Sequence, residues 1–410
     1  MKTKLLFCLF VAAGMSHSTG FAAQSNEAVH SPRNVKLEAL RERLKKRDKA
    51  EREEILSWIR RTGVSKRRQL AGGKVLELRR APPGRRPQFY VTNNVDAADT
   101  VSTDEVWPGG TAGLSLDGSG MTVGEWDAGA VLANHPDLFG RVTQVDGVTA
   151  ISDHSTHVAG TLVGAGVSLL PDARGMAYGA MLDAYDWNGD TTEMATAAAA
   201  GLLLSNHSYG IAAGWVQIGD SPPNNWWWLG GVAAQEDPNF GYYDTESQLW
   251  DQIAWNAPYY LIVKAAGNDR WDIGPAAGEE YTMVDQAGAP LGTSTTPRPA
   301  DCSPAGYDCL PTTSVAKNIL TIGAVDDLIG GYAPLAGPSQ VQVTGFSSFG
   351  PTDDGRIKPD LVGNGWLLLS TYGHDPYFAP AIGTSMAAPN VTGSLLLLQQ
   401  HYEAVNSSYM

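Results

Sequence analysis

Short apolar runs alternate with longer, alanine-rich segments through the last three quarters of this chain. The apolar runs have the length of buried strands and lie at 121–126, 181–185, 202–207, 260–266 and 319–325. Helical patterns follow His157, surround Met194–Leu203, cover Ser247–Asn256 and follow Ser385. Strands that alternate with helices form parallel sheets covered by helices. The sequence therefore predicts an α/β fold with a parallel sheet flanked by helices on both faces.

Three polar residues stand at boundaries of these expected elements. Asp127 closes the first strand, where α/β sheets build their sites. His157 lies where a polar loop turns into a small-residue helix, and Ser385 lies in a turn that opens an apolar helix. A serine hydroxyl is a weak nucleophile near neutral pH and needs a histidine base and a carboxylate. Taken singly, each residue is more often structural, but together they supply a complete catalytic set.

The segments around these residues resemble the three catalytic motifs of the subtilisin-like serine proteases, the subtilase family or peptidase family S8. They read Asp127-Ala128-Gly129, His-Ser-Thr-His-Val-Ala-Gly at 154–160 and Gly-Thr-Ser-Met-Ala-Ala-Pro at 383–389. The resemblance covers about residues 88–410 and implies a secreted serine endopeptidase. It implies that Ser385 is the nucleophile, His157 the base and Asp127 the carboxylate that holds the imidazolium. We expect His154 to be a hydrogen-bonding neighbour.

Two further segments match the same family. The segment Ala265-Ala266-Gly267-Asn268 matches its oxyanion-hole segment, so Asn268 is expected to donate its side-chain amide. The segment 206–210 resembles the strand that pairs with an extended substrate. The resemblance implies that the first specificity pocket is walled by Ser208, Tyr209, Gly210, Ala265, Ala266 and Gly267.

The amino-terminal part predicts export and a zymogen. Residues 1–23 carry two lysines, an apolar run and small residues, which is typical of a signal peptide and predicts an extracellular or periplasmic protein. Residues 1–87 contain 21 Lys and Arg against 8 Asp and Glu, a formal charge of +13, whereas the remainder has 8 against 35, or −27. We therefore interpret residues 24–88 as a basic propeptide that docks on an acidic catalytic domain at 89–410.

Local patterns in the basic region predict a helix with Leu37, Leu40, Leu44, Ile55, Trp58 and Ile59, followed by strands at 75–78 and 88–91. The alternative is an arm that binds a polyanion. We favour the propeptide, and expect polypeptide substrates and the chain's own propeptide as partners. We expect neither nucleic acid nor membrane as a partner, and a monomer.

The cysteines and the acidic residues suggest stabilising links. Removal of a signal peptide would leave Cys302 and Cys309, for which a local disulfide is favoured because no histidine nearby completes a metal site. No cofactor is expected for catalysis. The family often binds calcium structurally, but the best local candidate, 186–193, is equally well a solvated turn, so the metal ligands stay unknown.

Three features of the sequence differ from the usual pattern of the family. The segment 210–250 adds a lobe rich in tryptophan and tyrosine, whose aromatic residues are expected mainly to pack the lobe. Glu125 and Trp126 stand where the family usually has aliphatic residues. Only 25 residues follow Ser385, which suggests a catalytic domain truncated at its carboxyl end and a poorly packed Ser385 helix. The alternative function is therefore an inactive peptide-binding scaffold or fragment.

Overall fold

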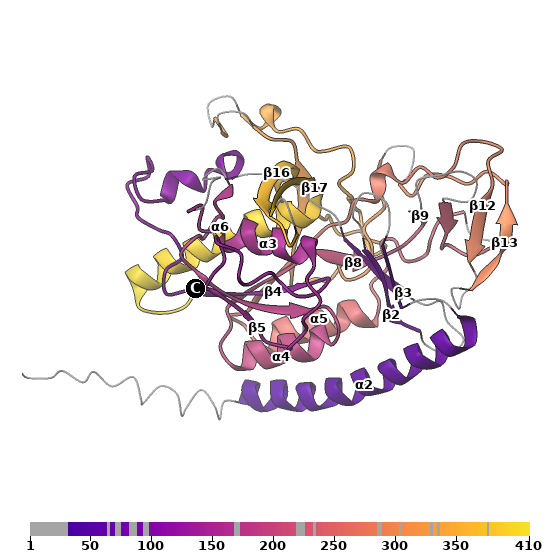
Figure 1. Cartoon of the computed structure of the whole chain (residues 1–410), viewed down its shortest axis with the longest axis horizontal. Helices are drawn as coiled ribbons and strands as arrows, with labels where there is room; N and C mark the ends of the chain where they lie inside the picture. Colours follow the sequence, from indigo (N-terminus) through magenta and orange to yellow (C-terminus); the bar gives the residue numbers. More distant parts are fainter. Residues whose placement is uncertain are drawn as a thin grey trace, which may run out of the picture.

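A computed structural model describes most of the chain from residue 32 onward (Figure 1). The described ranges are 32–63, 66–69, 75–81, 88–92, 98–167, 173–218, 226–232, 235–284, 289–302, 306–328, 331–333, 337–374 and 377–410. The expected signal peptide at residues 1–23 lies outside these ranges. No helix within them is long and apolar enough to cross a bilayer.

A seven-stranded sheet forms the centre of the molecule, and every neighbouring pair of strands in it is parallel. The strand order is β15 (Leu361–Asn364), β14 (Leu320–Val325), β11 (Leu261–Ala265), β7 (Leu204–His207), β4 (Thr122–Asp127), β6 (Met181–Asp186) and β5 (Val142–Gln144). The five strands expected from the sequence are all present. The predicted parallel α/β sheet is confirmed.

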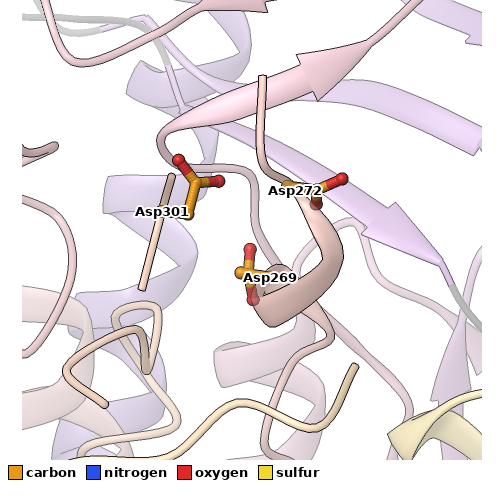
Figure 2. A group of neighbouring side chains, drawn as sticks. All are labelled: Asp269, Asp272 and Asp301. Carbon is orange, nitrogen blue, oxygen red and sulfur yellow. The ribbon is translucent and has the colours of Figure 1, made fainter. Parts of the chain in front are cut away.

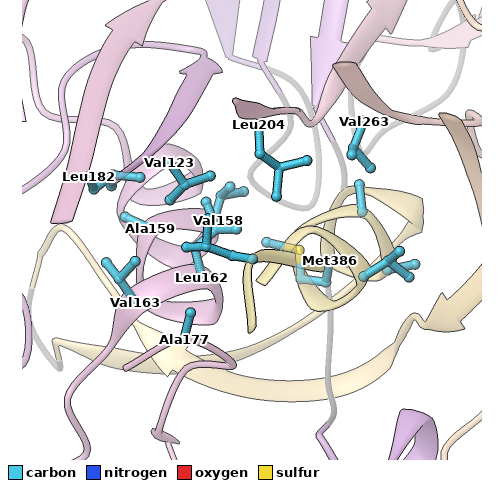
Figure 3. Packing of buried hydrophobic residues seen from close by; sticks show 14 of the residues in the cluster. Val123, Val158, Ala159, Leu162, Val163, Ala177, Leu182, Leu204, Val263 and Met386 are labelled. Atoms are coloured by element: carbon cyan, nitrogen blue, oxygen red, sulfur yellow. The ribbon is translucent and has the colours of Figure 1, made fainter. Parts of the chain in front are cut away.

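Helices cover both faces of this sheet, so its central strands are buried on both sides. On one face, α3 (Asp153–Val163) and α6 (Thr384–Asn406) contribute Leu162 and Met386 to a core that also contains Val123 of β4 (Figure 3). On the other face, α4 (Asp190–Ala199) and α5 (Thr245–Asn256) enclose Trp126 of the same strand. Side chains alternate across a strand, so residues of β4 serve both cores.

The helix that begins at Ser385's turn is well packed. Its residues Met386, Ala387, Val391 and Leu396 are buried, and α6 contacts α3, β7, β11, β14 and β15. The expectation that this helix lacks a packing partner is therefore wrong. The reason is that the sheet and α3 supply apolar contacts along the helix.

The basic region forms a long helix and a small sheet. Helix α2 (Pro32–Thr62) runs along α4 and α5 (Figure 1), where the Arg47 guanidinium lies 3.3 Å from the Glu246 carboxylate. Strands β1 (Arg67–Gln69), β2 (Val75–Arg80) and β3 (Gln88–Thr92) pair antiparallel. The predicted helix and strand pair are present. The predicted domain boundary at residue 88 falls inside β3, which pairs with β2.

Strand β3 also joins the basic region to the remainder of the chain. It pairs antiparallel with β8 (Tyr209–Ile211), and Val91 lies opposite Gly210. The expected substrate-pairing strand thus has a neighbour from the same chain.

The aromatic segment 210–250 contributes two strands, β9 (Trp215–Gln217) and β10 (Trp226–Trp228), to a second small sheet. The order in this sheet is β13 (Pro290–Ser294), β12 (Tyr281–Val284), β10 and β9. Trp215, Trp228 and Tyr281 pack together in its buried centre. The expectation that these aromatic residues mainly pack the lobe is confirmed for Trp228.

The remaining elements are short. A hairpin of β16 (Trp366–Thr371) and β17 (Phe378–Ile382) lies beside α3. Four 3₁₀ turns complete the described elements: η2 (Asp99–Val101), η3 (Asp104–Val106), η5 (Asp269–Trp271) and η7 (Pro338–Gln340).

Candidate active site

The carboxylate of Asp127 is fully buried at the end of β4 and faces the first turn of α3. Its Oδ1 lies 2.5 Å from Nδ1 of His154, and the Ala128 N–H donates to the same oxygen over 2.6 Å. The hydroxyl of Ser155 donates to it over 3.2 Å. These contacts fix His154 with Nδ1 toward the carboxylate, which leaves Nε2 as the nitrogen able to take up a proton.

The local sequence explains why His154 meets Asp127. Ser152 caps α3, since its hydroxyl accepts a hydrogen bond from the Ser155 N–H. The helix therefore starts at Asp153, and His154 falls in its first turn beside the strand ends.

The prediction that His157 pairs with Asp127 is wrong. His157 is fully buried, and its Nε2 lies 3.1 Å from both the Leu368 and the Ala379 carbonyl oxygens, on the β16–β17 hairpin. Burial lowers the pKa of His157 to about 4, so the imidazole is neutral at pH 7. His157 therefore links α3 to the hairpin and does not contact the carboxylate.

Ser385 lies at the second residue of α6, where the helix amide groups favour a developing negative charge. The preceding Gly383 has φ 149 and ψ 165, a conformation open mainly to glycine. The Ser385 hydroxyl donates to the Ser208 carbonyl over 2.9 Å, and the Ser208 hydroxyl donates to the Ser385 carbonyl over 2.6 Å. To reach an imidazole, the Ser385 hydroxyl must rotate away from Ser208.

Asn268 follows β11 and faces the start of the same helix. Its Oδ1 accepts a hydrogen bond from the Thr384 N–H over 2.8 Å. The Gly267 N–H donates to the Thr384 hydroxyl over 3.1 Å. Since the amide oxygen is engaged, the amide NH₂ of Asn268 is the end that can donate to a bound oxygen.

A narrow cavity of about 40 Å³ opens beside Ser385. Of the residues expected to wall the specificity pocket, it is lined by Tyr209, Gly210, Ala265 and Gly267, together with Asn268. Ala266 instead packs in a core cluster with Leu310 and Val315. Ser208 does not line the cavity and is held by Ser385.

Lys264 was not singled out from the sequence, although a lysine inside an apolar strand is an unusual signal. It is buried, lines the cavity and donates from Nζ to the Tyr209 and Ala265 carbonyl oxygens. Burial lowers the pKa of Lys264 to about 7. Its main structural effect is to connect β11 to β8 through the carbonyl groups.

Glu125 of β4 is a second charged residue type inside an apolar strand. It is fully buried beside Asp127, and neither carboxyl oxygen has a hydrogen-bond partner within the described residues. Burial, and then the charge of Asp127, raises the pKa of Glu125 well above its usual value. Burial therefore favours the protonated form of Glu125.

Three carboxylates could hold a cation. Asp269, Asp272 and Asp301 each offer an oxygen, and these oxygens lie within 4.8 Å of one another (Figure 2). Both oxygens of Asp301 accept from the Trp215 N–H, over 2.8 and 2.9 Å. At the candidate turn 186–193, Asp186 accepts from Asn188, and Glu193 accepts from Trp126. The calcium expectation stays a prediction.

The disulfide prediction is confirmed. Cys302 and Cys309 are bonded, with Cα atoms 5.0 Å apart. Both are buried against Phe240 and Ala213, near one wall of the cavity.

The fold and the site define a class of α/β protein, in which an aspartate, a histidine and a serine stand at the carboxyl edge of a parallel sheet. The family model described as "Subtilase family" matches residues 118–409. The chain therefore belongs to the subtilase family.

Individual relatives match the chain in part. The C5a peptidase of Streptococcus pyogenes is 46% identical over 65 residues, which is 16% of this chain and 6% of that protein. The serine protease AprX of Bacillus subtilis is 27% identical over 321 residues, covering 70% of this chain and 59% of AprX. The chain thus spans less than two thirds of the length of either.

Solved structures show a more distant likeness. The CspB protease of Clostridium perfringens is 16% identical with a TM-score of 0.49, and the match covers 76% of this chain and 88% of that one. At that level the likeness bears on neither activity nor substrate.

Proposed function

We propose that this chain is a secreted serine endopeptidase that hydrolyses extended polypeptides through Asp127, His154 and Ser385. The observation that carries the proposal is the buried contact of His154 with Asp127 at the sheet edge from which α6 presents Ser385. Family membership supports the same chemistry.

The proposed reaction is acyl transfer to serine. Ser385 Oγ attacks the peptide carbonyl while His154 Nε2 accepts its proton, and His154 then gives that proton to the leaving amine. Asp127 stabilises the imidazolium through its contact with Nδ1. The Asn268 amide and the Ser385 N–H donate to the oxyanion, and water hydrolyses the acyl-enzyme by the same proton transfers.

We further propose that residues 24–92 act as a propeptide. Two observations support this extension of the predicted region by β3. Strand β3 pairs with the β8 edge that an extended substrate would need, and Arg47 of α2 contacts the buried Glu246. Strand addition of this kind holds a peptide through backbone hydrogen bonds.

The test compares the purified chain with Ser385→Ala and His154→Ala, using unfolded casein and a fluorophosphonate probe. We expect the wild type to be labelled and to cleave casein. Neither reaction should occur with Ser385→Ala, and cleavage should be lost with His154→Ala. A folded wild type that binds peptide stoichiometrically without labelling or turnover would instead identify a peptide-binding scaffold.

A further inference from the structure

Carboxylates lie at the cavity beside Ser385. Asp269 and Asp272 line the same cavity as Ser385 and Asn268. Asp301, which is 4% exposed, completes the group (Figure 2). The cavity is defined as a substrate pocket by the nucleophile and the oxyanion donor, independently of these charges.

The cavity has both apolar and acidic lining residues. Ile211, Ala212, Ala213, Val216 and Pro311 supply apolar surface, and Asp269 and Asp272 supply carboxylates. A lysine or arginine side chain buries its aliphatic stem against apolar surface and keeps its charged group at a polar end. The combination of apolar surface and carboxylates fits such a side chain.

We propose that this cavity binds the side chain of the residue that precedes the cleaved bond, and that it selects lysine or arginine there. The proposal rests on the proposed peptidase function and names the substrate class of the same site. Asp269 and Asp272 would receive the cationic group, and Asp301 would contribute through its proximity to both.

The charge balance of the cavity favours a cation. Burial, followed by the charges of Asp272 and Asp269, raises the pKa of Asp301 well above its usual value. A bound cation would relieve this repulsion. The positive charge of Lys264 opposes the binding of a cation only in part. Its Nζ is turned to the Tyr209 and Ala265 carbonyl oxygens, and burial lowers the pKa of Lys264 to about 7.

The first experiment uses the purified wild-type chain and tetrapeptide p-nitroanilides that differ only in the last residue: Lys, Arg, Leu, Phe or Glu. We expect kcat/KM for Lys and Arg to exceed that for Leu by at least about tenfold. Cleavage that favours Leu, Phe or Glu overturns this inference and leaves the proposed function intact. A folded chain that cleaves neither these peptides nor casein, and that the fluorophosphonate does not label, refutes the proposed function and the inference with it.

The second experiment removes one charge. Asp272→Asn is preferred to a change at Asp269, because the Asp269 carboxylate accepts from Ser348 and adjoins Asn268. The backbone bond from Asp301 N–H to the Asp272 carbonyl remains. We expect the Lys-to-Leu ratio of kcat/KM to fall about tenfold while Leu cleavage persists.

The matched control is Asp354→Asn, the same chemical change on a side chain that is 43% exposed and lies outside the cavity. Its Lys-to-Leu ratio should equal that of the wild type. An unchanged ratio in Asp272→Asn, measured on protein that still cleaves the Leu peptide, would overturn the role of Asp272. Asp272→Lys gives the opposite test, since it should favour Glu over Lys.

Discussion

His154 and Asp127 are joined by a contact of 2.5 Å between Nδ1 and Oδ1, which links the first turn of α3 to the last residue of β4. His157 lies in the same helix, yet its ring faces the carbonyl groups of the β16–β17 hairpin. The two histidines therefore have different surroundings, and the difference can be measured.

Replacing His154 with alanine should abolish turnover. The expected loss in kcat is about a millionfold, a magnitude established for this family and not obtained from the geometry. His157→Gln is the matched control, because glutamine retains an N–H donor for the two carbonyl groups, and it should keep most of the activity. Equal losses in the two folded variants would contradict the assignment.

His157 should make the protein sensitive to acid. Its pKa is lowered from 6.5 to about 4 in the folded state, so the unfolded chain binds more protons in that interval and stability falls as the pH falls. Between pH 7 and pH 4.5 this group should cost about 2 kcal/mol of unfolding free energy. Urea unfolding of wild type and His157→Gln at both pH values isolates the effect. Equal losses of unfolding free energy in the two proteins between these pH values would contradict it.

Asn268→Ala should lower kcat with little change in KM. The lost donor is worth about 3 kcal/mol of transition-state stabilisation, again a value known from this family. Because the Thr384 N–H also loses its acceptor, circular dichroism and fluorophosphonate labelling must accompany the kinetics. Asn256→Ala at the end of α5 serves as control. An equal loss in kcat in that variant would contradict the assignment of Asn268 as an oxyanion donor.

Glu125→Met should stabilise the protein. The substitution removes a buried carboxyl group that lacks hydrogen-bond partners among the described residues, with a gain of about 1–3 kcal/mol. The pKa of Glu125 is raised, so its contribution to stability declines as the pH rises above the unfolded value. The gain in unfolding free energy should therefore grow from pH 5 to pH 8. A destabilised variant would show that Glu125 has an essential partner.

Removal of the disulfide should have a moderate effect. The two cysteines are separated by 7 positions, and a loop of that length stabilises the native state by about 2 kcal/mol in the chain-entropy model. A Cys302→Ser, Cys309→Ser double variant should unfold at lower urea concentration, and reductant should shift the wild type likewise. If the midpoint stayed constant, the bond would act only locally.

Five of the seven strands and the helices that cover the sheet could be predicted because each of those strands contains a short apolar run and each helix has a helical pattern. The strands β5 and β15 were not predicted, since each has only three or four residues. The partners of individual histidines could not. His154 and His157 lie three positions apart, and the choice between them depends on where α3 begins. Ser152 was the available signal, since a capping serine places His154 in the first turn of the helix and His157 one turn further along.

The carboxylate group at the cavity was also beyond sequence reasoning. Asp269 and Asp272 lie close together in the chain, but Asp301 reaches them only after two intervening strands, β12 and β13. Similarly, the segment 210–250 was expected to form a lobe, whereas its strand β10 pairs with β12, which comes from outside that segment. Contacts between distant segments depend on packing that no local pattern records.

The pairing of β3 with β8 has a consequence for competition. While β3 is covalently joined to the rest of the chain, its pairing with the β8 edge is intramolecular, which corresponds to an effective concentration on the order of millimolar. Peptides at micromolar concentration cannot displace a strand held in that way. After a cut in the chain between β3 and β8, β3 becomes a separate ligand that dissociates on dilution. The β8 edge is therefore freed by the loss of the covalent connection, without any change in β8 itself.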